Sequence, residues 1–166
     1  MVKIYWIEQK KSGKLGMMAR PRGGEWLTDE ITELKNNGVK EIVSLLETEE
    51  AIELELGDEK QECEKQGIKF LSYPIKDRNV PDSMKDTVEI GLQINHSLET
   101  GNIVVLHCRQ GIGRTGLLVC VVLLQQKYSL DYLLPYLTNI RGCSIPETPL
   151  QSDWLLRFEH YLSFIS

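Results

Sequence analysis

The sequence of 166 residues lacks the marks of a disulfide-stabilised or membrane-spanning protein. Its four cysteines show no paired C-x-x-C spacing, which argues against a zinc ribbon and a disulfide framework, so we expect reduced thiols. The longest strongly apolar run, Leu117 to Leu124, is far too short to cross a bilayer, and no secretory signal is visible. We therefore expect a soluble, cytoplasmic protein that does not engage a membrane.

Internal repeats, low-complexity segments and Pro/Ser-rich linkers are also missing. With 42% hydrophobic and 26% charged residues, the chain can bury a core of its own, and we expect a single domain over residues 1–166. The spacing of apolar residues alternates between a two-residue period and a helical period. This pattern predicts an α/β fold with a central, mostly parallel twisted sheet flanked by helices.

Acidic residues outnumber basic ones, 24 to 19, so the formal net charge is −5. The excess is concentrated between Glu47 and Glu64, where nine acidic residues meet only Lys60. Such a balance disfavours a broad surface for nucleic acid or anionic membranes, so we expect no nucleic-acid partner and a monomer. We interpret the acidic segment as a solvated helical face, with a docking patch for basic partners as the alternative.

Local signals place the regular elements along the chain. Thr28 is suited to cap a helix that Gly38 ends, and Ser83 is suited to cap a second helix that reaches Glu99. Strands are predicted at residues 3–8 and 14–19 around a Ser12-Gly13 turn, and at residues 39–46, 68–75 and 102–108.

The stretch "HCRQGIGRTG", residues 107–116, lies between the predicted strand 102–108 and an apolar helix. Gly111, Gly113 and Gly116 spell G-x-G-x-x-G, and Asp131 follows twenty residues after the first glycine. A dinucleotide fold needs that acid at the end of a second strand, whereas Asp131 follows Ser129 in the first turn of a predicted helix. The sequence therefore argues against a dinucleotide cofactor.

A glycine turn that leaves a strand and opens a helix directs backbone N–H groups inward and forms a cradle for a tetrahedral oxyanion. Gly111 and Gly113 allow close approach of the main chain, and Arg114 can grip two oxygens in fork geometry. A Walker loop is excluded, since Arg114 stands where lysine is required. Cys108 would lie beneath the phosphate, in surroundings that favour a nucleophilic thiolate. Thr115 can donate to that sulfur and ease its departure, although it can also be an ordinary first-turn threonine.

The same residues fit H-C-x-x-G-x-x-R-[S/T], and the stretch resembles the signature of the cysteine-dependent protein tyrosine and dual-specificity phosphatases. The resemblance implies a phosphocysteine intermediate on Cys108, phosphate binding by Arg114, and support of the cysteine by His107. It also implies a phosphate-binding loop made of Arg109, Gln110, Gly111, Ile112, Gly113 and Arg114. Metal ligation by His107 is disfavoured, because only His96 and His160 accompany it, so we expect no metal and no cofactor.

Displacing an alkoxide or phenoxide from phosphorus requires a proton donor on a loop that faces the cradle. Asp77 is the candidate, since it lies thirty-one residues before Cys108, where the resemblance puts a movable acid loop. Asp82 is the rival, and an ordinary turn aspartate is the alternative for Asp77. The aromatic residue expected two positions before the acid is missing, as Ile75 and Lys76 precede it. The sequence also shows no tyrosine-bearing loop that would form a deep phosphotyrosine slot, which shifts the resemblance toward the compact dual-specificity branch.

The segment "RGCSIPETPLQSDWLL" resembles the glutamine-bearing loop of these enzymes, with Thr148 and Gln151 at the matching positions. The resemblance implies that Gln151 holds the hydrolytic water, and an exposed, idle glutamine is the alternative. Cys143 could trap oxidised Cys108 as a disulfide, although a small buried residue is the favoured interpretation. Cys120 is expected to lie in the core.

The leading hypothesis is a phosphatase acting on phosphoproteins, with phosphotyrosine preferred and phosphoserine or phosphothreonine as further substrates. The alternatives are a phospho-binding module without catalysis, and the same chemistry on phosphoinositides or RNA 5′-phosphates. Gln110 and Ile112 are neutral and only Arg109 adds charge, which disfavours a multiply phosphorylated inositol ring. Arg20, Arg22 and Trp26 could contact a substrate, and an exposed turn explains them equally well.

Overall fold

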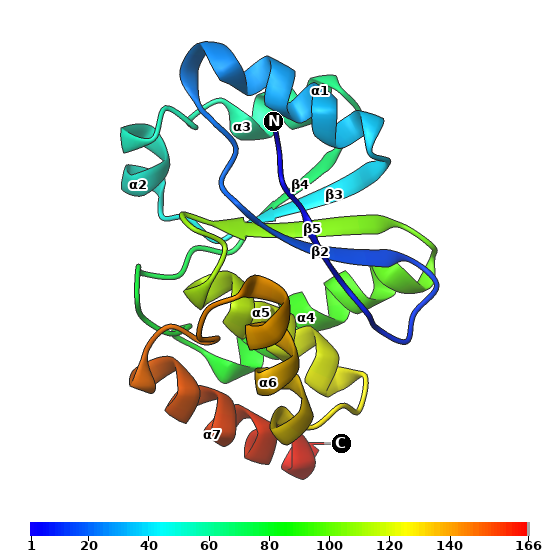
Figure 1. Cartoon of the computed structure of the whole chain (residues 1–166), viewed down its shortest axis with the longest axis vertical. Helices are drawn as coiled ribbons and strands as arrows, with labels where there is room; N and C mark the ends of the chain where they lie inside the picture. The colour runs from blue at the N-terminus through cyan, green and yellow to red at the C-terminus, as the bar shows by residue number, and fades with distance from the viewer. Residues whose placement is uncertain (166) are drawn as a thin grey trace.

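The computed structural model describes residues 1–165 (Figure 1). Its strands are β1 Tyr5–Ile7, β2 Lys14–Ala19, β3 Val39–Ser44, β4 Lys69–Ser72 and β5 Ile103–Cys108. Its α-helices are α1 Leu27–Asn36, α2 Thr48–Glu53, α3 Glu59–Lys65, α4 Met84–Glu99, α5 Gly113–Gln125, α6 Leu130–Arg141 and α7 Pro149–Ile165, and a 3-10 turn spans Gly24–Trp26.

The strands form one sheet in the order β1-β2-β5-β3-β4. Only β1 is antiparallel to its neighbour, and the other pairs are parallel, so the predicted mostly parallel sheet is confirmed. In the register, Ala19 of β2 pairs with Cys108 of β5, and Ser44 of β3 pairs with His107. The carboxyl ends of these three strands therefore meet at one edge, where parallel sheets place their ligands.

Helices cover both faces of the sheet (Figure 1). On one face α1 and α3 pack over Ile42 and Val105, and on the other α4 to α7 pack over Val104 and Leu106. Strand β5 is buried on both sides, which explains its unbroken apolar sequence. Helix α5 is buried along nearly its whole length, so the apolar run belongs to the core. No helix within residues 1–165 has the length and apolarity needed to span a bilayer.

The helix boundaries confirm one predicted cap and correct another. Ser83 caps α4, because its Oγ accepts a hydrogen bond from the Asp86 backbone N–H at 3.1 Å. Gly38 follows the end of α1 with φ +84, as a helix terminator requires. Thr28 does not cap α1, because the 3-10 turn before it carries the chain directly into a helix that begins at Leu27.

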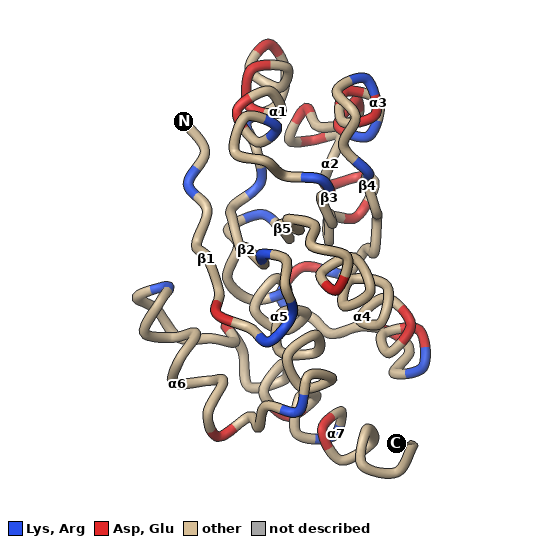
Figure 2. Tube along the Cα trace, turned by 90° about the vertical axis from the view of Figure 1, so that its right-hand side faces the viewer, with Lys and Arg blue, Asp and Glu red and all other residues tan. Residues whose placement is uncertain are grey.

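The acidic segment forms the two short helices α2 and α3. Figure 2 shows acidic and basic residues closely spaced along α3. The interpretation of the acidic segment as a solvated helical face is wrong for two of its acidic residues, since the side chains of Glu50 and Glu59 are only 10% and 3% exposed. These two carboxylates point inward: Glu59 lies against His107 in β5, and Glu50 accepts from Arg114 at the start of α5.

Candidate active site

Cys108 is the last residue of β5 and opens into a pocket of about 260 Å³ at the carboxyl edge of the sheet. The cysteine is buried, with 3% of its surface exposed. Residues from four segments line the pocket, namely Asp77, Arg78, Cys108, Arg109, Gln110, Gly113, Arg114 and Glu147. The fold thus brings together most of the residues that the sequence predicts for the site.

The backbone of the loop after Cys108 is held from one side. The carbonyl of Arg109 accepts from the Arg20 backbone N–H at 3.3 Å, and Arg141 donates to the carbonyls of Gln110 at 3.1 Å and Gly111 at 3.0 Å. In a trans peptide the following N–H points opposite to the carbonyl. The N–H groups of residues 110–112 therefore turn away from Arg20 and Arg141, and none of them donates to another described residue. This orientation leaves the amides available to an anion.

Gly111 and Ile112 shape the loop without lining the pocket. Gly111 has φ +70, and a Cβ at this position would lie 2.3 Å from the backbone oxygen of Met18. Glycine is therefore required for both conformation and packing against β2. The Ile112 side chain packs against the core, so the predicted substrate contact of these two residues is restricted to their backbone.

Arg114 is 2% exposed, and carboxylates and carbonyls fix its guanidinium. Its two terminal nitrogens each donate to Glu50 at 2.8 Å, Nη1 also donates to the Ile75 carbonyl at 2.9 Å, and Nη2 lies 3.2 Å from Asp77 Oδ1. Burial alone would lower the pKa of Arg114, but hydrogen bonds to Glu50 and the negative charges of Cys108, Glu50 and Asp77 raise it. Arg114 is thus a fixed cation at the pocket floor.

Arg109 is held by helix α2, which also carries the Glu50 that binds Arg114. Its Nε lies 3.4 Å from Glu50, and its Nη2 donates to Glu53 at 3.2 Å. The Arg114 hydrogen bonds are the main cause of a lowered pKa at Glu50, and the charge of Arg109 adds to the effect. Helix α2 therefore orients both arginines of the loop.

His107 lies behind the cysteine, fully buried. Its Nδ1 donates to the Cys108 carbonyl at 3.3 Å, and its Nε2 lies 2.7 Å from Glu59 Oε2 on α3. Both ring nitrogens are engaged, so the imidazole is placed to support the cysteine rather than to exchange protons with substrate. Within residues 1–165, no group of three His, Cys, Asp or Glu side chains is arranged to hold a metal ion.

Asp77 lies on the pocket wall with its side chain 56% exposed, within ion-pair distance of Arg114. The next residue, Arg78, has φ +59 and forms an ion pair with Glu147 across the pocket mouth. Asp82 is exposed and does not line the pocket. Of the two candidate acids, only Asp77 is positioned to face a ligand above Cys108.

Gln151 is fully buried in the first turn of α7, so the exposure expected in the alternative interpretation is wrong. Its Oε1 accepts from the backbone N–H groups of Glu147 at 3.1 Å and Thr148 at 3.3 Å, and its Nε2 donates to the Asn79 carbonyl at 3.1 Å. A Cβ at Gly113 would lie 3.1 Å from this Oε1. Gln151 therefore joins the Asp77 loop to the start of α7 beside the phosphate-binding loop.

The remaining hydroxyl and thiols differ sharply in their surroundings. The buried Thr115 Oγ1 has no hydrogen-bond partner among the described residues, so the expected bond to the Cys108 sulfur is not formed in this structure. Burial raises the pKa of both Cys63 and Cys120 to about 12, which keeps them as unreactive thiols. Cys143 is half-buried and lies outside the pocket wall.

Three residues that hold the site were not predicted, namely Glu50, Glu59 and Arg141. The motif itself could have predicted that such partners exist, because a buried arginine and a buried histidine beside a nucleophile require charged partners. Because nine acids crowd residues 47–64, the sequence does not distinguish which of them turn inward.

Comparison with known proteins gives one family and many similar folds. The model of a family described as "Polymorphic toxin system, DSP-PTPase phosphatase" matches residues 15–127. A kinase associated phosphatase (KAP) with its catalytic-site cysteine replaced by serine is 23% identical, with TM-score 0.91 and coverage of 98% of this chain and 96% of that one. Tk-PTP in its active form is 25% identical, with TM-score 0.74 and coverage of 94% and 97%.

PTPMT1 in complex with PI(5)P is 20% identical, with TM-score 0.75 and coverage of 96% and 97%. The chain has no significant match among curated protein sequences.

Proposed function

The chain belongs to the DSP-PTPase phosphatase family of polymorphic toxin systems, and on that premise we propose that it hydrolyses phosphorylated polypeptides through a phosphocysteine on Cys108. It is a phosphatase with the fold of the compact dual-specificity enzymes in the cysteine-dependent superfamily. One observation carries the proposal: Cys108, Arg114 and Asp77 line a single pocket. The KAP structure, whose catalytic residue is a cysteine, supports the choice of nucleophile.

In the first step the Cys108 thiolate attacks phosphorus, an S–P bond forms and the bond to the leaving oxygen breaks. Asp77 gives its proton to that oxygen, so the product leaves as a neutral alcohol or phenol. Loop amides and the Arg114 guanidinium stabilise the three equatorial oxygens. Asp77 Oδ1 lies 3.2 Å from Arg114 Nη2. A phosphate dianion competes for the same guanidinium, and the released Asp77 carboxylate takes a proton from solvent before it donates that proton to the leaving oxygen.

In the second step water attacks phosphorus, the S–P bond breaks and inorganic phosphate leaves. Asp77, now a carboxylate, takes the proton from water. Gln151 uses one N–H for the Asn79 carbonyl, and its second N–H is assigned to the water. Thr115 has an unpartnered hydroxyl next to Arg114, and we assign it a hydrogen bond to the departing sulfur.

Phosphoinositide is the second candidate substrate, because PTPMT1, similar in fold, binds PI(5)P. The charges around the pocket favour a polypeptide. Asp77 and Glu147 line the wall, and Glu53 neutralises Arg109 at the rim. Because Arg114, Arg78 and Arg109 pair with these three carboxylates, the repulsion of an anionic membrane comes from the exposed Glu47 and Glu49 beside the pocket.

The test is turnover of p-nitrophenyl phosphate by the parent protein, with and without a chelator. We expect coloured product at a rate that the chelator leaves unchanged, and none from Cys108→Ser. Binding of phosphate without any turnover by the parent would instead indicate a phospho-binding module and contradict the proposal.

A further inference from the structure

Asp77 lies in a tight turn, here called the acid turn (residues 76–79), whose third residue adopts a backbone conformation unusual for its type. The Asn79 backbone N–H donates to the Lys76 carbonyl at 3.0 Å and closes the turn. Arg78 follows Asp77 with φ +59, in the left-handed region that glycine and asparagine favour. A residue with a Cβ adopts this conformation at a cost in energy, so other contacts must hold the Arg78 backbone in place.

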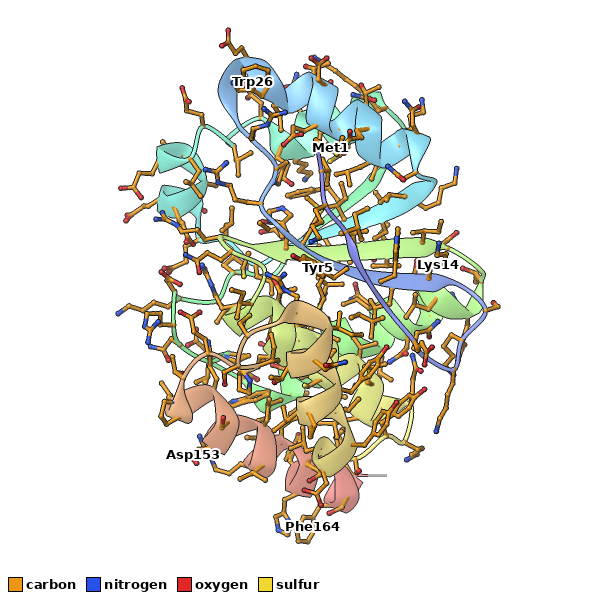
Figure 3. All side chains as sticks on the ribbon, viewed as in Figure 1. Met1, Tyr5, Lys14, Trp26, Asp153 and Phe164 are labelled. Atoms are coloured by element: carbon orange, nitrogen blue, oxygen red, sulfur yellow. The ribbon has the colours of Figure 1, made fainter. Side chains whose placement is uncertain are left out.

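The contacts that hold the acid turn come from the segment at the start of α7. The Arg78 guanidinium pairs with the Glu147 carboxylate across the pocket mouth. Gln151 donates through Nε2 to the Asn79 carbonyl at 3.1 Å and accepts through Oε1 from the Glu147 backbone N–H at 3.1 Å. Figure 3 labels Asp153 near the start of α7, which lies on the side of the molecule where β5 ends. Two consecutive residues of the acid turn are therefore attached to one point of the fold.

Glu147 also lies against the phosphate-binding loop. A Cβ at Gly113 would lie 2.8 Å from Glu147 Oε2 and 3.1 Å from Glu147 Cβ, so only a residue without a side chain admits Glu147 at this place. The two carboxylate oxygens thus face different segments, because Oε1 accepts from Arg78 and Oε2 lies over Gly113. Glu147 therefore sets the position of the acid turn relative to the loop that holds the phosphate.

The exposure of this ion pair separates a role in positioning from a role in folding. The Arg78 side chain is 61% exposed and that of Glu147 is 31% exposed. Ion pairs at this level of exposure contribute little to global stability, because water screens the charges. The effect of the pair falls instead on the local conformation of the acid turn, where the left-handed backbone of Arg78 has to be maintained.

We propose that Arg78 and Glu147 are positioning residues for proton transfer, since their ion pair holds the acid turn so that the Asp77 carboxyl faces the leaving oxygen above Cys108. The inference rests on the proposed phosphatase function. When the pair is broken, the backbone of residue 78 relaxes and Asp77 is less often within reach of the leaving oxygen. Proton donation then slows, whereas Cys108 and Arg114 keep their places.

The test compares two leaving groups in Arg78→Ala and Glu147→Gln. Proton donation matters most for an alkyl phosphate and least for p-nitrophenyl phosphate. We expect kcat for the alkyl phosphate to fall about tenfold in each variant, with a smaller loss for p-nitrophenyl phosphate and nearly unchanged KM. Arg78→Lys keeps the charge and should recover part of the loss. Lys11→Ala removes an ion pair with Glu99 at the opposite edge of the sheet and, as the matched control, should behave as the parent.

A second measurement shows whether the effect passes through Asp77. In an Asp77→Asn background, Arg78→Ala should cause no further loss on the alkyl phosphate, because the proton donor is already gone. The same tenfold loss in that background, or equal losses on both leaving groups, would overturn the inference. Parent-like rates in both Arg78→Ala and Glu147→Gln would also overturn it. Absence of p-nitrophenyl phosphate turnover by the parent would overturn the proposed function itself.

Discussion

Glu50 on α2 and Arg114 at the start of α5 form two parallel hydrogen bonds of 2.8 Å each, although they are 64 residues apart in sequence. This bidentate pair fixes the guanidinium plane before a phosphate arrives. An arginine held in this way loses little freedom when it grips two phosphate oxygens.

Glu50→Gln should therefore lower kcat/KM by about 10²-fold, since a misplaced guanidinium no longer matches the equatorial oxygens. We expect an accompanying loss of about 1–3 kcal/mol in the free energy of unfolding, measured in urea at pH 7. Glu49→Gln, on the exposed side of the same helix, is the matched control and should behave as the parent. Equal activity of both variants would show that Arg114 orients itself without Glu50.

The same pair predicts a pH dependence of stability. Arg114 lowers the Glu50 pKa below its ordinary 4.5, so the carboxylate contributes stability at neutral pH and loses it as pH falls through the lowered pKa. The difference in unfolding free energy between parent and Glu50→Gln should be constant above pH 4.5 and shrink below it. A difference that grows on acidification would contradict the assignment.

Glu59 and His107 form a second buried link, from α3 to the residue before the nucleophile, at 2.7 Å. Glu59→Gln keeps the shape but removes the charge, so we expect about tenfold slower turnover and slower alkylation of Cys108 by iodoacetamide at pH 7. Glu64→Gln, exposed on the same helix, is the control. Parent-like alkylation and turnover in Glu59→Gln would limit this pair to a role in folding.

The loss of rate on removal of the proposed acid, Asp77, should depend on the leaving group of the substrate. Asp77→Asn is expected to slow hydrolysis of an alkyl phosphate by about 10²–10⁴-fold, and to slow p-nitrophenyl phosphate less, because that phenoxide leaves with little protonation. Asp82→Asn should change neither rate. If the two asparagine variants exchanged these behaviours, Asp82 would be the acid.

Alanine substitutions at Gly111 and Gly142 separate the cost of an unfavourable backbone conformation from the cost of a steric clash. Both have positive φ, but a Cβ at Gly111 would meet the Met18 backbone oxygen at 2.3 Å, whereas one at Gly142 meets nothing within 4 Å. Gly142→Ala should cost about 1–2 kcal/mol in urea unfolding and leave activity intact. Gly111→Ala should cost at least about 2 kcal/mol more and abolish turnover, because the loop must move. Similar losses in both variants would show that the loop tolerates the shift.

The parts of the site that follow from the sequence are those encoded locally. An unbroken apolar strand, glycines at 111 and 113 and an arginine six residues after Cys108 define a phosphate cradle within one short segment. The fold class follows similarly from the alternating periods. Arg141, in contrast, reaches the loop from 30 residues away, and Glu59 reaches His107 from 48. Such partners depend on how helices dock, and composition described the segment that holds Glu59 only as acidic.

Thr28 illustrates the same limit at smaller scale. Its residue type suits a cap, yet the 3-10 turn at Gly24–Trp26 leads into a helix that begins at Leu27, two residues before a helix capped by Thr28 would begin. Such a turn depends on the packing of the segment, which a capping preference does not describe.

The central claim is that Cys108 carries the phosphoryl group during turnover. Parent protein mixed with a phosphotyrosine peptide and quenched rapidly in acid should yield, by mass spectrometry, a phosphate adduct on the peptide that contains Cys108, and Cys108→Ser should yield neither adduct nor product. Turnover by Cys108→Ser would contradict the account. So would a phosphate adduct of the parent protein on any residue other than Cys108.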